Sequence, residues 1–139
     1  MADLNPFLRF NDGKCREAME FYKKCFGGTV SFMTLGESPM AKDSPGKENL
    51  IMHAELNSKD IVFFGSDMMR DKAIVGDNVG MALNCKSEEE IKDLFSKLSE
   101  GGEVFMPLEE AFWGATFGMV TDKYGIEWML NHQKKPVKK

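Results

Sequence analysis

The sequence lacks the features of membrane, fibrous and secreted proteins. No apolar stretch in the 139 residues approaches the ~18 needed to cross a membrane. Thirteen glycines and five prolines are too few for a fibrous or low-complexity chain. The first six residues have neither a basic region nor an apolar core, so we expect no secretory signal and a cytoplasmic location. With 42% hydrophobic and 29% charged residues, the chain is expected to form a single domain over residues 1–139.

Cysteine and net positive charge are also scarce. Cys15, Cys25 and Cys85 form an odd set without a Cys-x-x-Cys pair, which argues against a disulfide framework or a thiolate zinc site. The net charge is −4, and it would be −8 without the four lysines among the last six residues. Such an acidic body repels phosphate backbones, so we expect no binding to nucleic acids. The basic tail, residues 133–139, is predicted to be solvated and frayed.

Motifs that cradle phosphates or form nucleophilic triads are missing as well. The sequence contains no Gly-x-x-x-x-Gly-Lys-Ser/Thr stretch and no Gly-x-Gly-x-x-Gly stretch. It has only two histidines, and His132 stands next to the basic tail, where we expect it to be solvated. The positions of the two histidines support no Ser–His–Asp arrangement.

What the sequence does contain is an internal repeat. Two segments, 73 residues apart, share the i, i+3, i+4, i+7 spacing of apolar residues that is typical of a one-sided helix. The residues are Ala18, Phe21, Tyr22 and Cys25 in the first segment and Ile91, Leu94, Phe95 and Leu98 in the second. Each segment ends at a glycine pair, Gly27-Gly28 or Gly101-Gly102, which can take the left-handed conformation that closes a helix. Ser87 is placed to cap the second helix, with Glu90 as its reciprocal partner.

Strand-like stretches surround both predicted helices in the same order. One precedes each helix, at 7–10 and 81–85. Three follow each helix, at 29–35, 50–56 and 61–65 in the first half and at 103–106, 115–120 and 126–131 in the second. This β-α-β-β-β repeat predicts an α+β fold of two modules, at about 4–66 and 79–132, with a connector at 67–78. The loop at 36–49 has the length of a lid or binding loop.

Strand alternation predicts one apolar face and one mixed face. The apolar face, suited to being covered by helices, comprises Leu8, Phe10, Met81, Leu83, Cys85, Ile126, Trp128 and Leu130. The mixed face comprises Asn5, Phe7, Arg9, Ile51, His53, Glu55, Ala82, Asn84, Glu127, Met129 and Asn131. Because buried polar groups without partners are costly, the mixed face is not a plain core. It either faces water or lines a cavity in which a few polar groups sit among apolar ones.

Six short motifs stand at characteristic places in the two modules. They are Pro6-Phe7-Leu8-Arg9-Phe10, Ala18 with Phe21-Tyr22, Phe26-Gly27-Gly28, His53-Ala54-Glu55-Leu56, Phe112-Trp113-Gly114 and Asp122-Lys123-Tyr124-Gly125-Ile126-Glu127-Trp128. In order and spacing they resemble the vicinal oxygen chelate superfamily of glyoxalases, bleomycin-resistance proteins and dioxygenases, and within it the PhnB-like branch. The resemblance covers residues 4–132 and implies curved mixed sheets around a cavity, and a homodimer. Some PhnB-like proteins are labelled ubiquinone-pathway methyltransferases, but this chain has no glycine-rich cofactor loop after a strand.

The resemblance also implies where a metal would bind. Metal-dependent members carry four ligands on their cavity-facing strands, and the matching positions here are Asn5, Glu55, Gly80 and Met129. Only Glu55 is a good ligand, because glycine has no donor and a thioether suits hard or borderline metals poorly. A catalytic zinc-type site needs about three N, O or S ligands. We therefore expect no cofactor and no standard metal site, and the alternative is one divalent metal held by rearranged ligands that include His53 and Glu55.

Residues proposed to bind a ligand are Phe7, Arg9, His53, Glu55, Trp113 and Met129. His53 and Glu55 lie two apart on one strand and point the same way, so they offer two metal ligands, a catalytic acid–base pair, or a plain hydrogen bond. Arg9 either anchors a carboxylate or phosphonate, or pairs with Glu55 or Glu127.

Sulfur and aromatic side chains supply the remaining candidates. Phe112-Trp113 follows Glu109 and Glu110 in a predicted loop, where the pair closes over a ligand or a partner subunit, or packs at the loop base. Met33, Met52 and Met129 can form adaptable apolar walls. Cys25 and Cys85 fall on apolar faces and are predicted to be inert.

Three functions are compatible with these features. The first is a PhnB-like small-molecule-binding protein without the standard metal site, for which an anionic or oxygen-rich ligand is expected. The second is a metal-dependent lyase, isomerase or dioxygenase of the vicinal oxygen chelate type with rearranged ligands. The third is a non-catalytic interaction module, which the polar residues of the mixed face disfavour.

Overall fold

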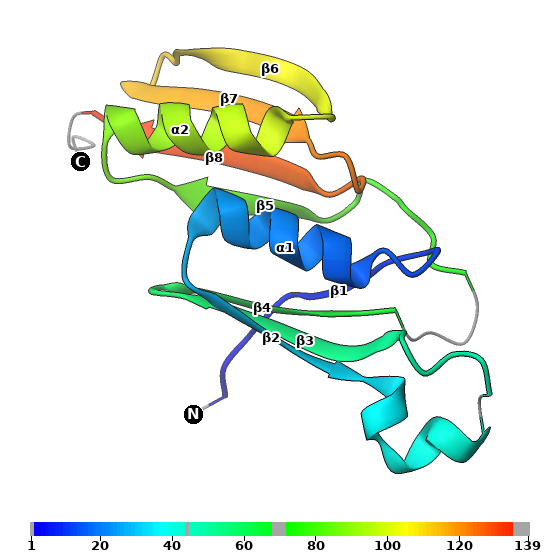
Figure 1. Cartoon of the computed structure of the whole chain (residues 1–139). Helices are drawn as coiled ribbons and strands as arrows, with labels where there is room; N and C mark the ends of the chain where they lie inside the picture. The colour runs from blue at the N-terminus through cyan, green and yellow to red at the C-terminus, as the bar shows by residue number, and fades with distance from the viewer. Residues whose placement is uncertain (1, 44, 68–71, 135–139) are drawn as a thin grey trace. The chain divides into compact units, whose positions relative to one another are not determined.

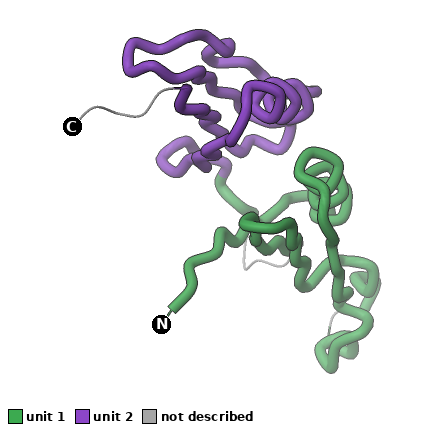
Figure 2. The backbone as a smooth tube through the Cα atoms, turned by 90° about the vertical axis from the view of Figure 1, so that its left-hand side faces the viewer, with its two compact units in different colours: residues 1–74 green, residues 75–139 purple. Residues whose placement is uncertain are grey.

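Two compact units, residues 1–74 (unit 1) and residues 75–139 (unit 2), make up the chain (Figure 2). The computed structural model describes residues 2–43, 45–67 and 72–134. Each unit contains one α-helix and one four-stranded mixed sheet, which confirms the predicted α+β fold. No helix within the described ranges is long and apolar enough to span a membrane. Of the predicted connector, residues 68–71 lie outside the described residues, as do residues 135–139 of the predicted tail.

Unit 1 follows the predicted order of elements. β1 (Phe7–Arg9) leads into α1 (Cys15–Phe26), and β2 (Thr29–Thr34), β3 (Ile51–Ser58) and β4 (Ile61–Ser66) come after the helix (Figure 1). The sheet has the order β1-β4-β3-β2, in which β1 runs parallel to β4 and the other neighbours are antiparallel. The segment predicted as one long loop contains two short 3-10 helices, η1 (Leu35–Glu37) and η2 (Pro39–Asp43).

Unit 2 repeats this topology. Its elements are β5 (Gly80–Asn84), α2 (Glu88–Ser99), β6 (Glu103–Glu110), β7 (Ala115–Thr121) and β8 (Glu127–Gln133), and the sheet order is β5-β8-β7-β6. β6 continues past the predicted end at residue 106, because register shifts on both sides of Met106 let the strand pass Pro107 and keep pairing with β7. Glu109 and Glu110 therefore lie in a strand and not in the predicted loop.

The helices bury the predicted residues with one difference between the units. In α1 the apolar positions are all buried, including Phe21, which is 8% exposed. In α2, Ile91 and Leu98 are completely buried, but Leu94 and Phe95 are only half-buried. The two helices thus occupy matching places in the repeat, but Leu94 and Phe95 of α2 are less buried than their counterparts in α1.

Glycine pairs end both helices, as predicted. Gly27 follows α1 with φ +76° and Gly101 follows α2 with φ +72°, values that favour glycine. The second glycine of each pair meets a strand closely. A Cβ on Gly28 would lie 2.3 Å from the Asn57 carbonyl oxygen, and one on Gly102 would lie 2.3 Å from the carbonyl oxygen of Thr121. Each helix therefore turns into its sheet where only glycine fits.

Side-chain hydrogen bonds stabilise the start of α2 and the turn between β7 and β8. The Ser87 hydroxyl caps α2 by accepting from the Glu90 N–H at 3.0 Å, and the Glu90 carboxylate accepts from the Lys86 N–H at 2.8 Å, one residue before the predicted partner. The buried carboxylate of Asp122 accepts from the backbone N–H of Ile126 and from the indole of Trp128. This explains the Asp122–Trp128 motif as the clamp of the β7–β8 turn.

Candidate functional site

One face of the sheet in unit 1 is covered by α1 and the other is not. A Cβ on Gly65 would lie 2.9 Å from the Met19 sulfur and 3.3 Å from the Cys15 sulfur, so Gly65 faces the helix. Its neighbour Phe64 points to the opposite side, because successive residues of a strand alternate. We call this opposite side the open face of unit 1; from the strand registers it contains Phe7, Arg9, Met33, His53, Glu55 and Phe64.

An aromatic cluster with one guanidinium occupies the open face of unit 1. The ring of His53 lies 5.3 Å from that of Phe64 and 6.3 Å from that of Phe7, measured between centroids. The guanidinium carbon of Arg9 lies 5.3 Å from the centroid of Phe7, within the range of a cation–π contact. Phe7 is 44% exposed, so the cluster is accessible to solvent. Three of the predicted binding residues, Phe7, Arg9 and His53, are therefore neighbours.

The charged groups of this face are not paired with one another. Among the described residues of unit 1, no ion pair joins Arg9 to Glu55, and no hydrogen bond joins His53 to Glu55. Glu55 on β3 lies in the same cross-strand row as Phe64 on β4 and Phe7 on β1, and β4 separates its strand from β1. Arg9 thus keeps its N–H donors free of that carboxylate.

Two residues of the predicted mixed face behave differently. Ile51 is only 1% exposed and belongs to the core, which corrects its assignment to the mixed face. The reason is a register shift at the end of β2, where Thr34 pairs with Ile51 directly after Met33 has paired with His53. The amide of Asn5 donates to the Val62 carbonyl at 3.2 Å, so it is engaged with the edge of β4.

Unit 2 has an open face of its own. A Cβ on Gly118 would lie 2.7 Å from the Phe95 ring of α2, so Gly118 faces the helix and its neighbours Phe117 and Met119 point away from it. From the strand registers, the open face of unit 2 holds Gly80, Ala82, Asn84, Glu103, Met106, Glu109, Phe117, Met119, Thr121, Glu127, Met129 and Asn131. The predicted binding residue Met129 is therefore on this face.

Trp113 is anchored against the same face. Its indole N–H donates to the Asn131 side chain at 3.2 Å, and its ring lies 5.4 Å from that of Phe117 at a steep angle. The amide of Gln133 donates to the Trp113 carbonyl at 3.0 Å. Phe112 packs edge-on against Trp113 and is 98% exposed, so it does not pack into a core at the loop base.

The structure thus places the predicted binding residues in two groups. Phe7, Arg9, His53 and Glu55 share the open face of unit 1, and Trp113 and Met129 belong to unit 2. Convergence of both groups on one cavity stays a prediction. Sequence reasoning missed Phe64 and Phe117. Strand alternation alone could not assign Phe64 to the open face, since Phe63 beside it is equally apolar. For Phe117 the Phe112-Trp113 motif was a signal, because it stands only a few residues earlier in the chain.

Metal-ligand chemistry is sparse within the described ranges. Residues 2–43, 45–67 and 72–134 contain no group of three or more His, Cys, Asp or Glu side chains that could hold a metal ion. Of the four positions that the resemblance maps to metal ligands, Gly80 and Met129 are neighbours: a Cβ on Gly80 would lie 3.8 Å from the Met129 methyl carbon. Whether the protein carries a metal stays a prediction.

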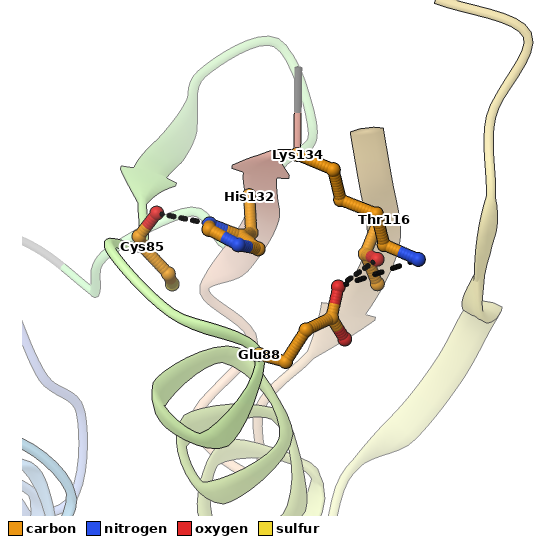
Figure 3. Close-up of polar contacts among 5 residues, drawn as sticks. All are labelled: Cys85, Glu88, Thr116, His132 and Lys134. Atoms are coloured by element: carbon orange, nitrogen blue, oxygen red, sulfur yellow. Dashed lines mark hydrogen bonds and ion pairs between the residues drawn. The ribbon is translucent and has the colours of Figure 1, made fainter. Parts of the chain in front are cut away.

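Two separate sets of polar contacts lie where the end of β8 meets the start of α2 (Figure 3). His132 is half-buried, and its Nδ1 lies 3.0 Å from the Cys85 carbonyl oxygen, so the expectation of a solvated His132 is wrong. The Glu88 carboxylate accepts from the Thr116 hydroxyl at 2.6 Å and pairs with Lys134 at 3.5 Å. The Thr116 hydrogen bond, followed by the charge of Lys134, lowers the pKa of Glu88. Sequence reasoning missed these contacts because their members come from three separate segments, at 85–88, 116 and 132–134.

Burial raises the thiol pKa of two of the three cysteines. All three are buried. Burial, with a smaller contribution from Asp67, raises the pKa of the Cys15 thiol to about 12. Burial and the nearby charge of Glu90 raise the pKa of Cys85 to about 11. Thiols with such pKa values stay protonated near neutral pH, which agrees with the prediction that Cys85 is inert.

Known proteins resemble this chain over nearly its whole length. The family model described as 3-demethylubiquinone-9 3-methyltransferase matches residues 2–131. Protein YjdN of Escherichia coli (strain K12) is 31% identical, and the match covers 92% of this chain and 93% of that protein.

Solved structures agree with the sequence matches. Protein PA1353 from Pseudomonas aeruginosa is 34% identical with a TM-score of 0.80, over 94% of this chain and 98% of that chain. A putative 3-demethylubiquinone-9 3-methyltransferase, PhnB protein, from Bacillus cereus is 29% identical with a TM-score of 0.74, over 94% and 99% of the two chains. A glyoxalase/bleomycin resistance protein/dioxygenase family enzyme from Burkholderia phytofirmans PsJN shares the fold, with a TM-score of 0.61, 12% identity and coverage of 95% and 99%. The repeated β-α-β-β-β topology and these matches show that the chain belongs to the PhnB-like, 3-demethylubiquinone-9 3-methyltransferase family.

Proposed function

We propose that this protein binds a small anionic or oxygen-rich molecule on the open face of unit 1. The observation that carries the proposal is the cluster of Arg9, Phe7 and His53, in which a guanidinium stands beside exposed aromatic rings. A guanidinium binds carboxylate and phosphonate groups through paired, charge-assisted hydrogen bonds. The rings supply apolar surface for the rest of the ligand, as in sites where a few polar groups fix the orientation of a mostly apolar contact.

The proposal includes no methyl transfer and no metal. A methyl donor of nucleotide type needs a phosphate- or nucleoside-binding loop, and the sequence has no glycine-rich loop of that kind. His53 and Glu55 share the open face, as the metal-dependent alternative requires, but two ligands fall short of the usual three. Metal analysis of the native protein distinguishes the alternatives: we expect well under one equivalent per chain, and stoichiometric metal lost in Glu55→Ala would favour the metal-dependent enzyme.

Ligands that differ only in charge provide the direct test. Benzoate and phenylphosphonate carry the expected anion on an aromatic ring, and benzamide has nearly the same shape without the charge. We expect the two anions to raise the melting temperature and benzamide to have little effect. At 100 times its dissociation constant, a ligand adds ~2.7 kcal/mol to the free energy of unfolding.

Two arginines form a matched pair of variants. Arg9→Ala removes the guanidinium from the open face and should abolish stabilisation by the anions. Arg16 also stacks on a ring, with its guanidinium carbon 4.6 Å from the centroid of Phe32, but it projects from α1. Arg16→Ala should therefore leave the stabilisation intact. Equal stabilisation by benzamide, or no difference between the two variants, would contradict the proposal.

A homodimer, which the resemblance implies, is part of the same proposal. The chain mass is 15.7 kDa, and light scattering on a size-exclusion column measures whether the particle in solution has twice that mass. A monomer at micromolar concentration would remove the dimer from the proposal without affecting the binding site, since all of the residues that carry it come from unit 1.

A further inference from the structure

Three methionines stand side by side on the open face of unit 2. Met129 of β8 lies directly opposite Met119 of β7, and Met119 lies directly opposite Met106 of β6. Directly opposed residues of antiparallel strands have Cβ atoms ~4.5–5.5 Å apart and share a face of the sheet. Three thioethers therefore form one row across three neighbouring strands.

The row is at the surface and not in the core. Gly118 and Leu108 face α2, since a Cβ on Gly118 would lie 2.9 Å from a methyl carbon of Leu108, and this directs Met119 to the other side. Met106 is 44% exposed, and Met119 and Met129 are half-buried. A methionine row in a hydrophobic core would be inaccessible, whereas this one can be reached from solvent.

Carboxylates border the row on both sides. Glu109 lies opposite Phe117 in the next row of the sheet, and Glu103 and Glu127 lie on either side of Thr121 in the row beyond Met119. Among the described residues that the registers assign to this face, none is lysine or arginine. The electrostatic potential at the row therefore favours a cation.

We infer that Met106, Met119 and Met129 form a binding site for a soft monovalent cation of the Cu(I) type. Thioether sulfur is a soft ligand that selects Cu(I) over hard and borderline divalent metals. The Met129 methyl carbon would lie 3.8 Å from a Cβ on Gly80, so the side chain extends toward β5. Rotation about its three single bonds brings the sulfur back over the row, because methionine is unbranched and flexible. This inference concerns unit 2 and does not depend on the proposed function of unit 1.

Silver(I), which binds like Cu(I) but has no accessible redox chemistry under these conditions, is the probe for the test. The full chain, labelled with ¹³C at the methionine methyls, is titrated with silver nitrate in chloride-free buffer. We expect the resonances of Met106, Met119 and Met129 to shift together and to saturate at one equivalent, with Zn(II) producing no shift. Met33 and Met40 are 41% and 51% exposed and serve as internal controls that should not shift.

Leucine variants locate the ion. Met119→Leu, which preserves side-chain volume, should weaken Ag(I) binding at least tenfold, and the control Met33→Leu should leave it unchanged. Parallel shifts of Met33 and Met40 would show adventitious thioether binding and overturn the inference. Full Ag(I) stoichiometry in a variant with all three methionines of the row changed to leucine would place the ion on a cysteine, with the same consequence.

Discussion

Unit 1 and unit 2 share a topology but differ in what their open faces present. Both sheets keep a glycine on the helix side, Gly65 against Met19 in one and Gly118 against Phe95 in the other. The open face of unit 1 carries a guanidinium and an imidazole among aromatic rings. The open face of unit 2 carries methionines bordered by carboxylates. Packing against the helix constrains one side of each sheet, and the other side is free to differ, so the two units differ most in the side chains of their open faces.

The largest expected difference between the units lies in their helices. Phe21→Ala should cost about 3–5 kcal/mol of unfolding free energy, the range for removing a buried phenylalanine. Leu94, its counterpart in the repeat, is half-buried, so Leu94→Ala should cost only about 1–2 kcal/mol. Urea denaturation of both variants measures the difference. Equal losses would mean that the helices are packed alike and that the difference in burial has no energetic weight.

The glycine pairs test a constraint that the units share. Gly102→Ala places a Cβ against the Thr121 carbonyl and should cost about 1–3 kcal/mol through overpacking. Gly28→Ala meets the same clash with Asn57 and also has a φ of +81°, which adds about 1–2 kcal/mol for the left-handed backbone.

Gly27→Ala is the control that isolates the backbone contribution. A Cβ on Gly27 would have no atom within 4 Å, while its φ is +76°. We therefore expect a loss of about 1–2 kcal/mol, smaller than at Gly28, in the same denaturation experiment. If Gly27→Ala and Gly28→Ala proved equally destabilising, the close approach of Gly28 to β3 would not contribute to the free energy of unfolding.

Helix capping is expected to differ by a smaller amount. Ser87 caps α2 through its hydroxyl, so Ser87→Ala should cost about 1 kcal/mol. Lys14, at the same position before α1, makes no side-chain capping hydrogen bond, and Lys14→Ala should change the stability by less than about 0.5 kcal/mol. Thermal denaturation of the two variants compares them. A larger loss at Lys14 would reverse the comparison.

The smallest effect concerns two threonine–glutamate pairs, one in each unit. The pKa of Glu88 is lowered chiefly by the Thr116 hydroxyl, whereas that of Glu37 is lowered first by the backbone N–H of Thr34 and then by its hydroxyl. Thr116→Val should therefore raise the pKa of Glu88 toward its ordinary value of 4.5 more than Thr34→Val raises that of Glu37. Carboxyl ¹³C titrations measure both shifts.

The sign of the accompanying pH dependence follows from the direction of these shifts. A carboxyl whose pKa is lowered by folding stabilises the folded state above the pKa of the unfolded chain, and this stabilisation disappears as the pH falls through the folded pKa. For Glu88 the loss therefore occurs below pH 4.5, and Thr116→Val should remove most of it. If the stability of Thr116→Val fell at acid pH as much as that of the unchanged protein, the hydrogen bond would not contribute to the pH dependence of stability.

Much of the candidate site could be predicted from local sequence patterns. Phe7 and Arg9 are two residues apart on one strand, and His53 and Glu55 are two apart on another, so alternation alone assigns each pair to one face. That the two strands bring Phe7 and His53 within 6.3 Å, with Phe64 between their strands, depends on the pairing of β1 with β4 and of β4 with β3. No local pattern specifies that pairing, because β1 and β4 lie more than fifty residues apart in the chain.

The sequence by itself determined the repeat, the element types and the helix ends, because hydrophobic periodicity, capping residues and glycine pairs act over a few residues. The tertiary structure decided the burial of Ile51, the passage of β6 beyond Pro107, the contact of His132 with the Cys85 carbonyl and the row of Met106, Met119 and Met129. The physical reason is the same in each case. Register shifts and cross-strand neighbours arise from pairing between segments distant in sequence, and a shift of one residue moves a side chain from one face of a sheet to the other.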